Sequence, residues 1–285
     1  MSVAAPLELV ERFDCFGGTV TLSASGASVA EVRTAAGFAR RLALDVHHRL
    51  TRYEPSSELS RLNADPRPAV PASAMLRRFA RAVHWAGTTS GGLVDATCSP
   101  PGVPAGWREH RAPVAAGGWR HVHAGHAHVL RPPGVHLDSG GLAKGIAADL
   151  MAAALAGCAT WMIDCRGDLR VGGTSGRERE VRVADPFDAD AVLHTLRVRR
   201  GAVATSGITR SAWAGGHHLT DPRTGRPAAT GLVQVTAVAD TGLQAEVRAK
   251  AALLAGPGRA PGHLPAGGVL VTAGGEPLLV PPVPR

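Results

Sequence analysis

Lysine and tyrosine are nearly absent from this chain of 285 residues. Arginine supplies almost all of the basic charge, lysine occurs only at Lys144 and Lys250, and Tyr53 is the only tyrosine. Rare residues must fall somewhere, so their positions alone assign nothing. The two lysines do mark positions where the chain carries an ammonium group although its usual cation is the guanidinium of arginine. Ammonium and guanidinium groups differ in their chemistry.

The chain also lacks cysteine pairs and long apolar runs. Its four cysteines show no C-x-x-C or zinc-like spacing, which is typical of reduced, mostly buried thiols in a cytoplasmic protein. The first residues contain no basic segment followed by an apolar one, and no stretch reaches the ~20 apolar residues of a membrane span. We therefore expect a cytoplasmic protein without a signal peptide or a membrane partner.

No run of five or six basic residues is present, although the formal charge is +8. Dispersed arginines predict a solvated basic surface rather than a nucleic-acid interface, so we expect no nucleic-acid partner. Hydrophobic residues make up 45% of the chain, which is enough for a sizeable core. We expect one domain over residues 1–285, built either as a single unit or as two intertwined lobes.

Short strands outnumber helices along the chain. The apolar spacing predicts helices over residues 28–50, 72–87, 142–157 and 244–255, the first with Ser28 as its N-cap. Residues 98–118 are dense in proline and glycine and predict an irregular loop. Strands are predicted at 18–23, 134–137, 160–164, 169–172, 181–184, 193–198, 202–205 and 232–238, with hairpins over 119–130 and 269–280. This order favours an α+β fold with a mixed or antiparallel sheet and flanking helices.

The segment His136–Gly145 combines a predicted strand end, Asp138, two glycines and a helix start. The first N–H groups of a helix lack intrahelical partners, so this turn suits a phosphate, and Lys144 adds a charge in the first helical turn. The glycine spacing matches neither a P-loop nor a dinucleotide fingerprint. A simple capped turn explains the segment equally well.

Three further segments carry polar groups at turns. Asp164 and Asp168 flank a Cys-Arg-Gly segment that favours a hairpin turn over a metal site. Thr205 and Ser206 end an apolar strand before a glycine, and His218 lies three residues before an Asp-Pro-x-Thr-Gly turn. A histidine there can act as a general base. Each segment is weak evidence by itself.

Taken in order, these segments resemble the ApbE family of FAD:protein FMN transferases. The likeness runs from about residue 16 to 256 and includes FGGT at 16–19, YEPSSELSRLN at 53–63, GLVDAT at 92–97, DSGGLAKG at 138–145, DCRGD at 164–168, ADP at 184–186, ATSG at 204–207 and HLTDPRTGRP at 218–227. The resemblance implies an ApbE-like, T-fold-related architecture. It also implies FAD as substrate, Mg²⁺ as metal, and an acceptor flavoprotein with a Thr or Ser flavinylation site as partner.

The resemblance assigns roles to individual residues. Catalysis is implied for Asp138 and His218, as candidates for accepting the hydroxyl proton. FAD contacts are implied for Phe16, Tyr53, Leu93, Val94, Asp95, Asp138, Lys144, Thr205, Ser206 and His218, with Tyr53 placed to stack on the isoalloxazine. For Phe16, Leu93 and Val94, core packing is an equally good interpretation.

The implied reaction is attack by an acceptor hydroxyl on the FMN-side phosphorus, with AMP as leaving group. If water replaced the acceptor, the protein would be an FAD pyrophosphatase. A family member that binds FAD without chemistry is the other alternative.

Two positions depart from the family pattern. The resemblance implies that magnesium is held by the Gly141 carbonyl and by an Asp and a Thr four residues apart, but here those two positions are Glu246 and Lys250. An ammonium cannot ligate a metal, so our hypothesis is that Lys250 is a charge substitute that weakens metal dependence. The second departure is Arg166, which replaces a glycine and could reach the diphosphate or narrow the pocket.

A histidine-rich segment, HVHAGHAH at 121–128, is a separate candidate. Side chains that alternate on paired strands could cluster and bind Zn²⁺ or Ni²⁺. We favour the simpler interpretation, which is the polar face of a hairpin.

Overall fold

A computed structural model describes residues 8–98, 116–188, 190–209, 212–213 and 216–284 of the chain. Its centre is an eight-stranded sheet of order β1-β2-β6-β7-β10-β15-β16-β17, in which every neighbouring pair is antiparallel. The strands of this sheet are β1 (Leu9–Cys15), β2 (Gly18–Ser25), β6 (Thr160–Cys165), β7 (Asp168–Gly172), β10 (Gly201–Gly207), β15 (Leu232–Ala239), β16 (Gly268–Thr272) and β17 (Pro277–Val280). The α+β prediction is confirmed, and the sheet is antiparallel rather than mixed.

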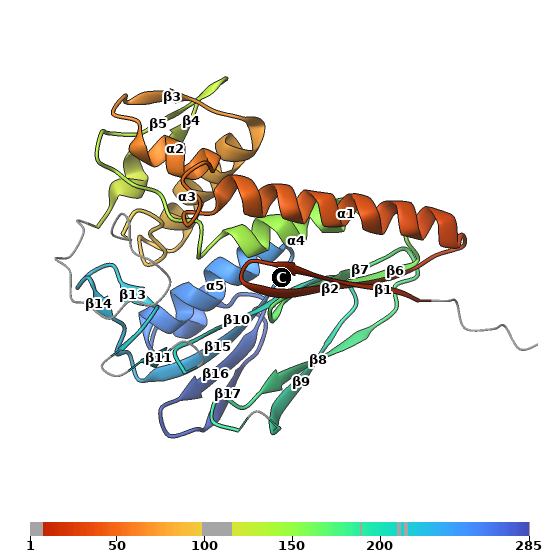
Figure 1. Cartoon of the computed structure of the whole chain (residues 1–285). Helices are drawn as coiled ribbons and strands as arrows, with labels where there is room; N and C mark the ends of the chain where they lie inside the picture. Colours follow the sequence, from red (N-terminus) through yellow and green to blue (C-terminus); the bar gives the residue numbers. More distant parts are fainter. Residues whose placement is uncertain (1–7, 99–115, 189, 210–211, 214–215, 285) are drawn as a thin grey trace, which may run out of the picture.

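Helices cover one face of the sheet, and a hairpin lies on the other side (Figure 1). The helices are α1 (Val29–Leu50), α2 (Glu58–Ala64), α3 (Ala74–Thr89), α4 (Ala143–Ala154) and α5 (Gly242–Ala255), with short 3-10 turns η1 (Gly118–His121) and η2 (Ala260–His263). The smaller strands are β3 (Ala69–Pro71), β4 (His123–Ala124), β5 (His128–Leu130), β8 (Arg179–Ala184), β9 (Val192–Val198), β11 (Ala212–Trp213), β12 (Gly216–His217), β13 (Thr220–Asp221) and β14 (Arg226–Pro227). Strands β8 and β9 form the hairpin.

The buried side chains form clusters that match these layers. The largest cluster joins β1, β2 and β6 to α1, α3 and α4, and a second joins α5 to β15 and β16. A third cluster lies under the β8–β9 hairpin, where Val181 and Val198 pack with Val171 and Val203 of the sheet. Burial of apolar area on both faces holds the sheet between its helices and the hairpin. Among the described helices, none has the length and apolar character needed to cross a membrane.

The helix predictions are confirmed with small shifts at the ends. Ser28 caps α1 by accepting the Glu31 N–H at 3.4 Å, as its sequence pattern indicates. Strand β1 and helix α2 have no counterpart among the predicted elements. The predicted loop 98–118 lies largely outside the described residues.

One strand prediction is wrong, and one hairpin prediction is confirmed only in part. Residues 134–137 form no strand, because the Asn63 side chain binds both the N–H and the carbonyl of Leu137 at 2.8 Å, in place of a neighbouring strand. The predicted hairpin over 119–130 starts instead with the 3-10 turn η1, and only β4 and β5 pair there. The turn interpretation of residues 164–168 is confirmed, since β6 and β7 pair across them.

Helices α4 and α5 cross closely at Gly145, and this contact positions the site described below. A Cβ atom on Gly145 would lie 2.7 Å from both Cα and N of Leu243. Backbone atoms cannot move aside as a flexible side chain can, so the two helices would have to separate. The close crossing therefore requires glycine at this position.

Gly145→Ala is expected to lower the free energy of unfolding by about 1–3 kcal/mol, the usual cost of overpacking. Chemical denaturation followed by circular dichroism measures it. The matched control is Gly157→Ala, where no described atom lies within 4 Å of the added Cβ and a change within about 0.5 kcal/mol is expected. Equal stability of the two variants would contradict the close-crossing argument.

Candidate active site

The turn before α4 presents its backbone to solvent. Gly140 is exposed and Gly141 is partly exposed, and in the described part of the chain no side chain caps the helix at Leu142. The turn is held from below, because the Ser139 hydroxyl donates to the Leu50 carbonyl at 2.6 Å. At the start of α4 the Leu142 and Ala143 N–H groups bond the Ser139 carbonyl, and the Gly145 N–H bonds Glu246. The turn therefore offers an anionic ligand its exposed glycine backbone and the positive dipole end of the helix, on an anchored support.

Asp138 is engaged by two donors at this turn. Its Oδ2 accepts a hydrogen bond from Arg52 at 2.8 Å, and its Oδ1 accepts the Gly140 N–H at 2.9 Å. The Arg52 guanidinium also donates to the Tyr53 hydroxyl at 3.1 Å and lies 5.1 Å from the centre of the Tyr53 ring. Arg52 thus links Asp138 to Tyr53, whose side chain remains exposed. Sequence patterns gave no signal for Arg52, since Asp138 lies 86 residues away.

Four charged side chains lie together beneath the turn. Lys144 pairs with Asp168, and Lys250 pairs with Glu246 at 3.0 Å. We call these four residues the buried quartet, because Glu246 is 1% exposed and the most exposed of the four, Lys144, is 26% exposed. The two lysines of the chain therefore meet in one cluster.

The quartet stabilises the charged forms of two of its members, Lys144 and Glu246. Burial alone would lower the pKa of Lys144, but the carboxylates of Asp168 and Glu246 outweigh burial and hold it above its ordinary value. Burial likewise acts to raise the pKa of Glu246, but the ammonium groups of Lys250 and Lys144 lower it below its ordinary range. Burial raises the pKa of Asp168 against the opposing effect of Lys144. Opposite charges therefore outweigh burial for Lys144 and Glu246, whereas burial prevails for Asp168.

The donor set at Gly141 does not fit a divalent metal. The Lys250 Nζ lies 3.1 Å from the Gly141 carbonyl oxygen and 3.0 Å from Glu246 Oε1. The other Glu246 oxygen accepts the Gly145 N–H at 2.9 Å. An ammonium group thus binds both of the oxygens that could serve as ligands, and it cannot itself ligate a metal.

The end of β10 meets the quartet from the sheet. The Thr205 N–H donates to Asp168 Oδ1 at 3.4 Å, and the Thr205 hydroxyl shares a hydrogen bond of 2.8 Å with that of Thr236. Ser206 follows and is partly buried. The ATSG segment therefore lies beside the buried end of Lys144 rather than at a separate place.

The segment at 92–97 also contacts the turn at Asp138. The Asp138 N–H donates to the Ala96 carbonyl at 2.8 Å. The Asp95 carboxylate accepts bonds from the Thr97 N–H and hydroxyl and from the Gly117 N–H, so it stabilises a loop. Val94 is buried. These contacts leave direct binding by Asp95 and Val94 a prediction and establish a supporting role for both.

Two further predicted residues are partly buried. Phe16 packs edge-on against His47, with ring centres 5.4 Å apart, and Leu93 packs against the cluster between α5 and β16. Arg166 bridges two hairpin turns, because its guanidinium donates to the Phe16 carbonyl at 3.0 Å. Arg166 thus ties its turn to the turn at Phe16, and its reach to a diphosphate remains a prediction.

The neighbouring histidines His217 and His218 differ in environment. His217 is buried, and its ring bonds the Ala228 carbonyl at 2.8 Å and the Leu219 N–H at 3.2 Å. Because Nδ1 accepts from an N–H, Nε2 must carry the proton, and the ring is a structural bridge. His218 is exposed and its ring is therefore the accessible one.

The histidine-rich segment does not assemble a metal site. His121, His123 and His126 are exposed. Over the described ranges, no group of three or more His, Cys, Asp or Glu side chains is arranged to hold a metal ion. The exposure of these three side chains agrees with the polar-surface interpretation of the segment.

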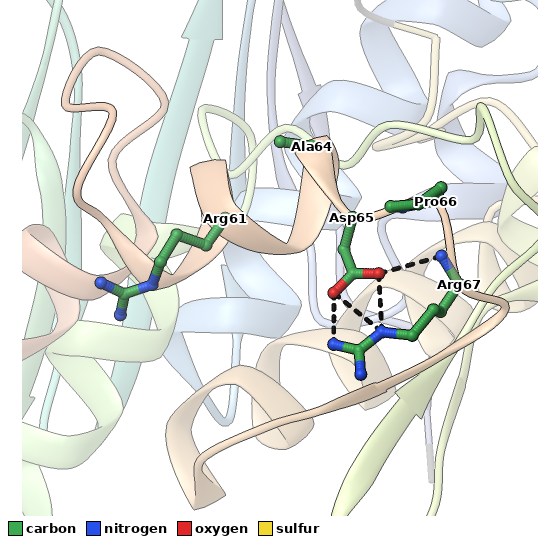
Figure 2. Close-up of a pocket in the computed structure, with 5 residues that line it drawn as sticks. All are labelled: Arg61, Ala64, Asp65, Pro66 and Arg67. Atoms are coloured by element: carbon green, nitrogen blue, oxygen red, sulfur yellow. Dashed lines mark hydrogen bonds and ion pairs between the residues drawn. The ribbon is translucent and has the colours of Figure 1, made fainter.

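Two surface hollows lie away from these residues. One, of about 400 Å³, is lined by Arg61, Ala64, Asp65, Pro66 and Arg67. Figure 2 shows that the Asp65 carboxylate there binds Arg67 while Arg61 points away. The other, of about 450 Å³, lies between α3 and the start of α5 and includes Trp85 and Asp149. Neither hollow includes a predicted site residue.

Sequence comparisons place the chain among known proteins. Residues 16–268 match the ApbE family. An FAD:protein FMN transferase of Rhodobacter capsulatus is 38% identical over 132 residues, which cover 44% of this chain and 25% of that protein. The FAD:protein FMN transferase of Escherichia coli (strain K12) is 30% identical over 137 residues, covering 45% and 39% respectively. The matched region thus spans well under half the length of these curated relatives.

Solved structures share the fold over nearly the whole chain. The ApbE protein from Thermotoga maritima superposes with a TM-score of 0.82 at 22% identity and covers 96% of this chain and 97% of its own. The flavin transferase ApbE from Vibrio cholerae gives a TM-score of 0.79 at 19% identity and covers 98% and 99%. With the family match over residues 16–268, the chain belongs to the ApbE family.

Proposed function

We propose that this protein is an FAD:protein FMN transferase, which moves FMN from FAD to a Thr or Ser hydroxyl of an acceptor flavoprotein and releases AMP. Family membership and the names of the two curated relatives support the proposal. The observation that carries it is the turn at the start of α4, where exposed glycine backbone lies over two partly buried ammonium groups. This arrangement suits the two phosphates of a dinucleotide.

Binding follows from the residues around this turn. The diphosphate would lie over Gly140 and Gly141, where the backbone can approach it closely and the dipole of α4 is positive. Tyr53 is 58% exposed, and a large aromatic ring left in solvent gains free energy by stacking on a flat heterocycle. Arg52 fixes the orientation of this ring through its bond to the hydroxyl. The isoalloxazine would therefore lie against Tyr53.

The reaction exchanges the phosphoanhydride bond of FAD for a phosphoester bond to the acceptor. The acceptor hydroxyl oxygen forms a bond to the FMN-side phosphorus, and the bond from that phosphorus to the bridging oxygen breaks, so AMP leaves with the bridging oxygen. The proton of the hydroxyl passes to a protein base. Both Asp138 oxygens hold other groups of the site, the Arg52 guanidinium and the Gly140 N–H. His218 is exposed, and an imidazole is the side chain that most often acts as a general base. We therefore assign the base to His218 and give Asp138 the task of positioning Arg52 and the turn.

Incubation with FAD and a flavodomain that carries a Thr acceptor is the direct test, with mass spectrometry of the acceptor and quantification of AMP. We expect the acceptor to gain the mass of esterified FMN, with one AMP released per modified acceptor. The assay is run with Mg²⁺ and with a chelator, so that a metal requirement is not mistaken for inactivity.

An acceptor variant with Thr replaced by Ala is the control and should stay unmodified. Free FMN and AMP with an unmodified acceptor would show an FAD pyrophosphatase instead. A complex that retains intact FAD under both conditions would show a carrier and would refute the transferase proposal.

A further inference from the structure

The Lys250 ammonium lies between the Gly141 carbonyl and the Glu246 carboxylate and contacts both. It therefore differs from an ordinary surface ion pair, which joins only two side chains. Exposed ion pairs four residues apart on a helix are common and weak. Here the ammonium leaves its own helix to bond the Gly141 carbonyl of another element, 109 residues away. A Cβ on Gly141 would lie 3.2 Å from Cε of Lys250. The side chain therefore packs directly beneath the glycine backbone that forms the candidate phosphate site.

The charges of the quartet balance without a metal ion. With all four side chains ionised, Lys144 and Lys250 cancel Asp168 and Glu246. Without Lys250 the remaining three groups would carry a net negative charge, directly below a turn proposed to bind an anion. A divalent cation could correct that imbalance, but the ammonium already does so. Because like charges in a site of low dielectric repel strongly, a second cation in the same place is unfavourable.

An ammonium group can also perform one task of a metal ion toward the ligand. It has three N–H donors, and the Gly141 carbonyl and Glu246 Oε1 accept two of them. The third donor is then available to a phosphate oxygen above the turn. Such a charge-assisted hydrogen bond stabilises negative charge on the phosphate.

We propose that the Lys250 ammonium replaces a divalent cation at this site, so that the protein binds the diphosphate of FAD without Mg²⁺. The identity of the ligand rests on the proposed function, but the exclusion of the metal does not. It rests on the position of Nζ between two oxygens that would otherwise be metal ligands.

Calorimetric titration of the ligand-free protein with Mg²⁺ alone tests the exclusion. Wild-type protein is expected to show no binding heat up to millimolar concentrations of Mg²⁺. Lys250→Thr removes the ammonium and leaves a short hydroxyl beside Glu246 and the Gly141 carbonyl, so this variant is expected to bind Mg²⁺ and to gain melting temperature with it. Circular dichroism checks that the variant is folded.

Titration with FAD, followed by flavin fluorescence, tests the consequence for the ligand. The wild-type affinity is expected to change less than about twofold between Mg²⁺ and a chelator, and that of Lys250→Thr by more than about tenfold. Lys250→Met keeps the bulk without the charge, so its affinity should fall and Mg²⁺ should not restore it. Lys250→Arg serves as the charge-retaining control and should remain indifferent to Mg²⁺.

Measurements on wild-type protein can overturn the inference even if no variant folds. Mg²⁺ binding to the ligand-free protein that is lost in Glu246→Gln would refute it, as would a tenfold gain in FAD affinity on adding Mg²⁺. If the wild type bound no FAD at all, the proposed function would fail, while the Mg²⁺ titration would still decide whether the metal is excluded.

Discussion

Lys144→Met is expected to lower the free energy of unfolding by about 3–5 kcal/mol, the typical cost of removing one partner of a buried ion pair. The Asp168 side chain is 5% exposed and would lose its closest cation. Asp168 also accepts a hydrogen bond from the Thr205 N–H, but at 3.4 Å this bond is too weak to compensate for that loss. Urea denaturation followed by circular dichroism gives the free energy directly.

Two further variants make this prediction specific. Lys144→Met combined with Asp168→Asn removes the buried charge as well as its partner, so it should recover part of the lost stability. Arg197→Ala removes an arginine that is 70% exposed and contacts Glu180 at 3.7 Å, and should cost less than about 1 kcal/mol. A loss for Lys144→Met no greater than that for Arg197→Ala would show that the quartet is not held by its charges.

The elements predicted well from sequence are those with a strong local signal. Helix α1 has apolar residues at helical spacing and a capping serine, and both features act within a few residues. Strand β1 has no clear sequence signal, because apolar and charged residues occur on both of its faces. Its outward face carries the exposed Val10 beside the charged Arg12 and Asp14, and its inward face includes the charged Glu11. The false strand at 134–137 had the apolar letters of a strand but an Asn63 side chain as its partner. Local pattern does not reveal such a partner.

The candidate site was predicted only in pieces. The ordered motifs placed Asp138, Lys144, Thr205 and Glu246 at turns and helix starts, and the structure brings their segments together. The contacts between them join residues far apart in sequence, as between Gly145 and Glu246, which lie 101 residues apart. Spacing along the chain cannot indicate such pairs. The rarity of lysine is a better guide to the site, since the only two lysines of the chain lie together in the quartet.

Arg52 shows the limit of reasoning by motif. It precedes Tyr53 in the sequence, yet no pattern distinguishes it from the many other arginines of the chain. Its importance appears only when its side chain is seen between Asp138 and Tyr53. An arginine that orders both an aromatic platform and a carboxylate is a positioning residue for the proposed site.

His218→Ala is expected to reduce FMN transfer by about 10²–10⁴-fold, the usual contribution of a general base. The affinity for FAD should stay within about threefold, because the diphosphate would be held at the start of α4 and by the lysines beneath it. Single-turnover transfer and FAD titration separate the two effects. Asp138→Asn, by contrast, weakens the hold on Arg52 and should reduce FAD affinity together with the rate, since Arg52 orders Tyr53.

The neighbouring histidine is the internal control for this assignment. His217→Ala removes a buried ring that bridges the Ala228 carbonyl and the Leu219 N–H. It should therefore lower the melting temperature by more than His218→Ala, which removes an exposed ring. His126→Ala, at an exposed histidine far along the sequence, should alter neither property. If His218→Ala transferred FMN at the wild-type rate while Asp138→Asn bound FAD normally and was inactive, the base would be Asp138, and the role of His218 proposed here would be wrong.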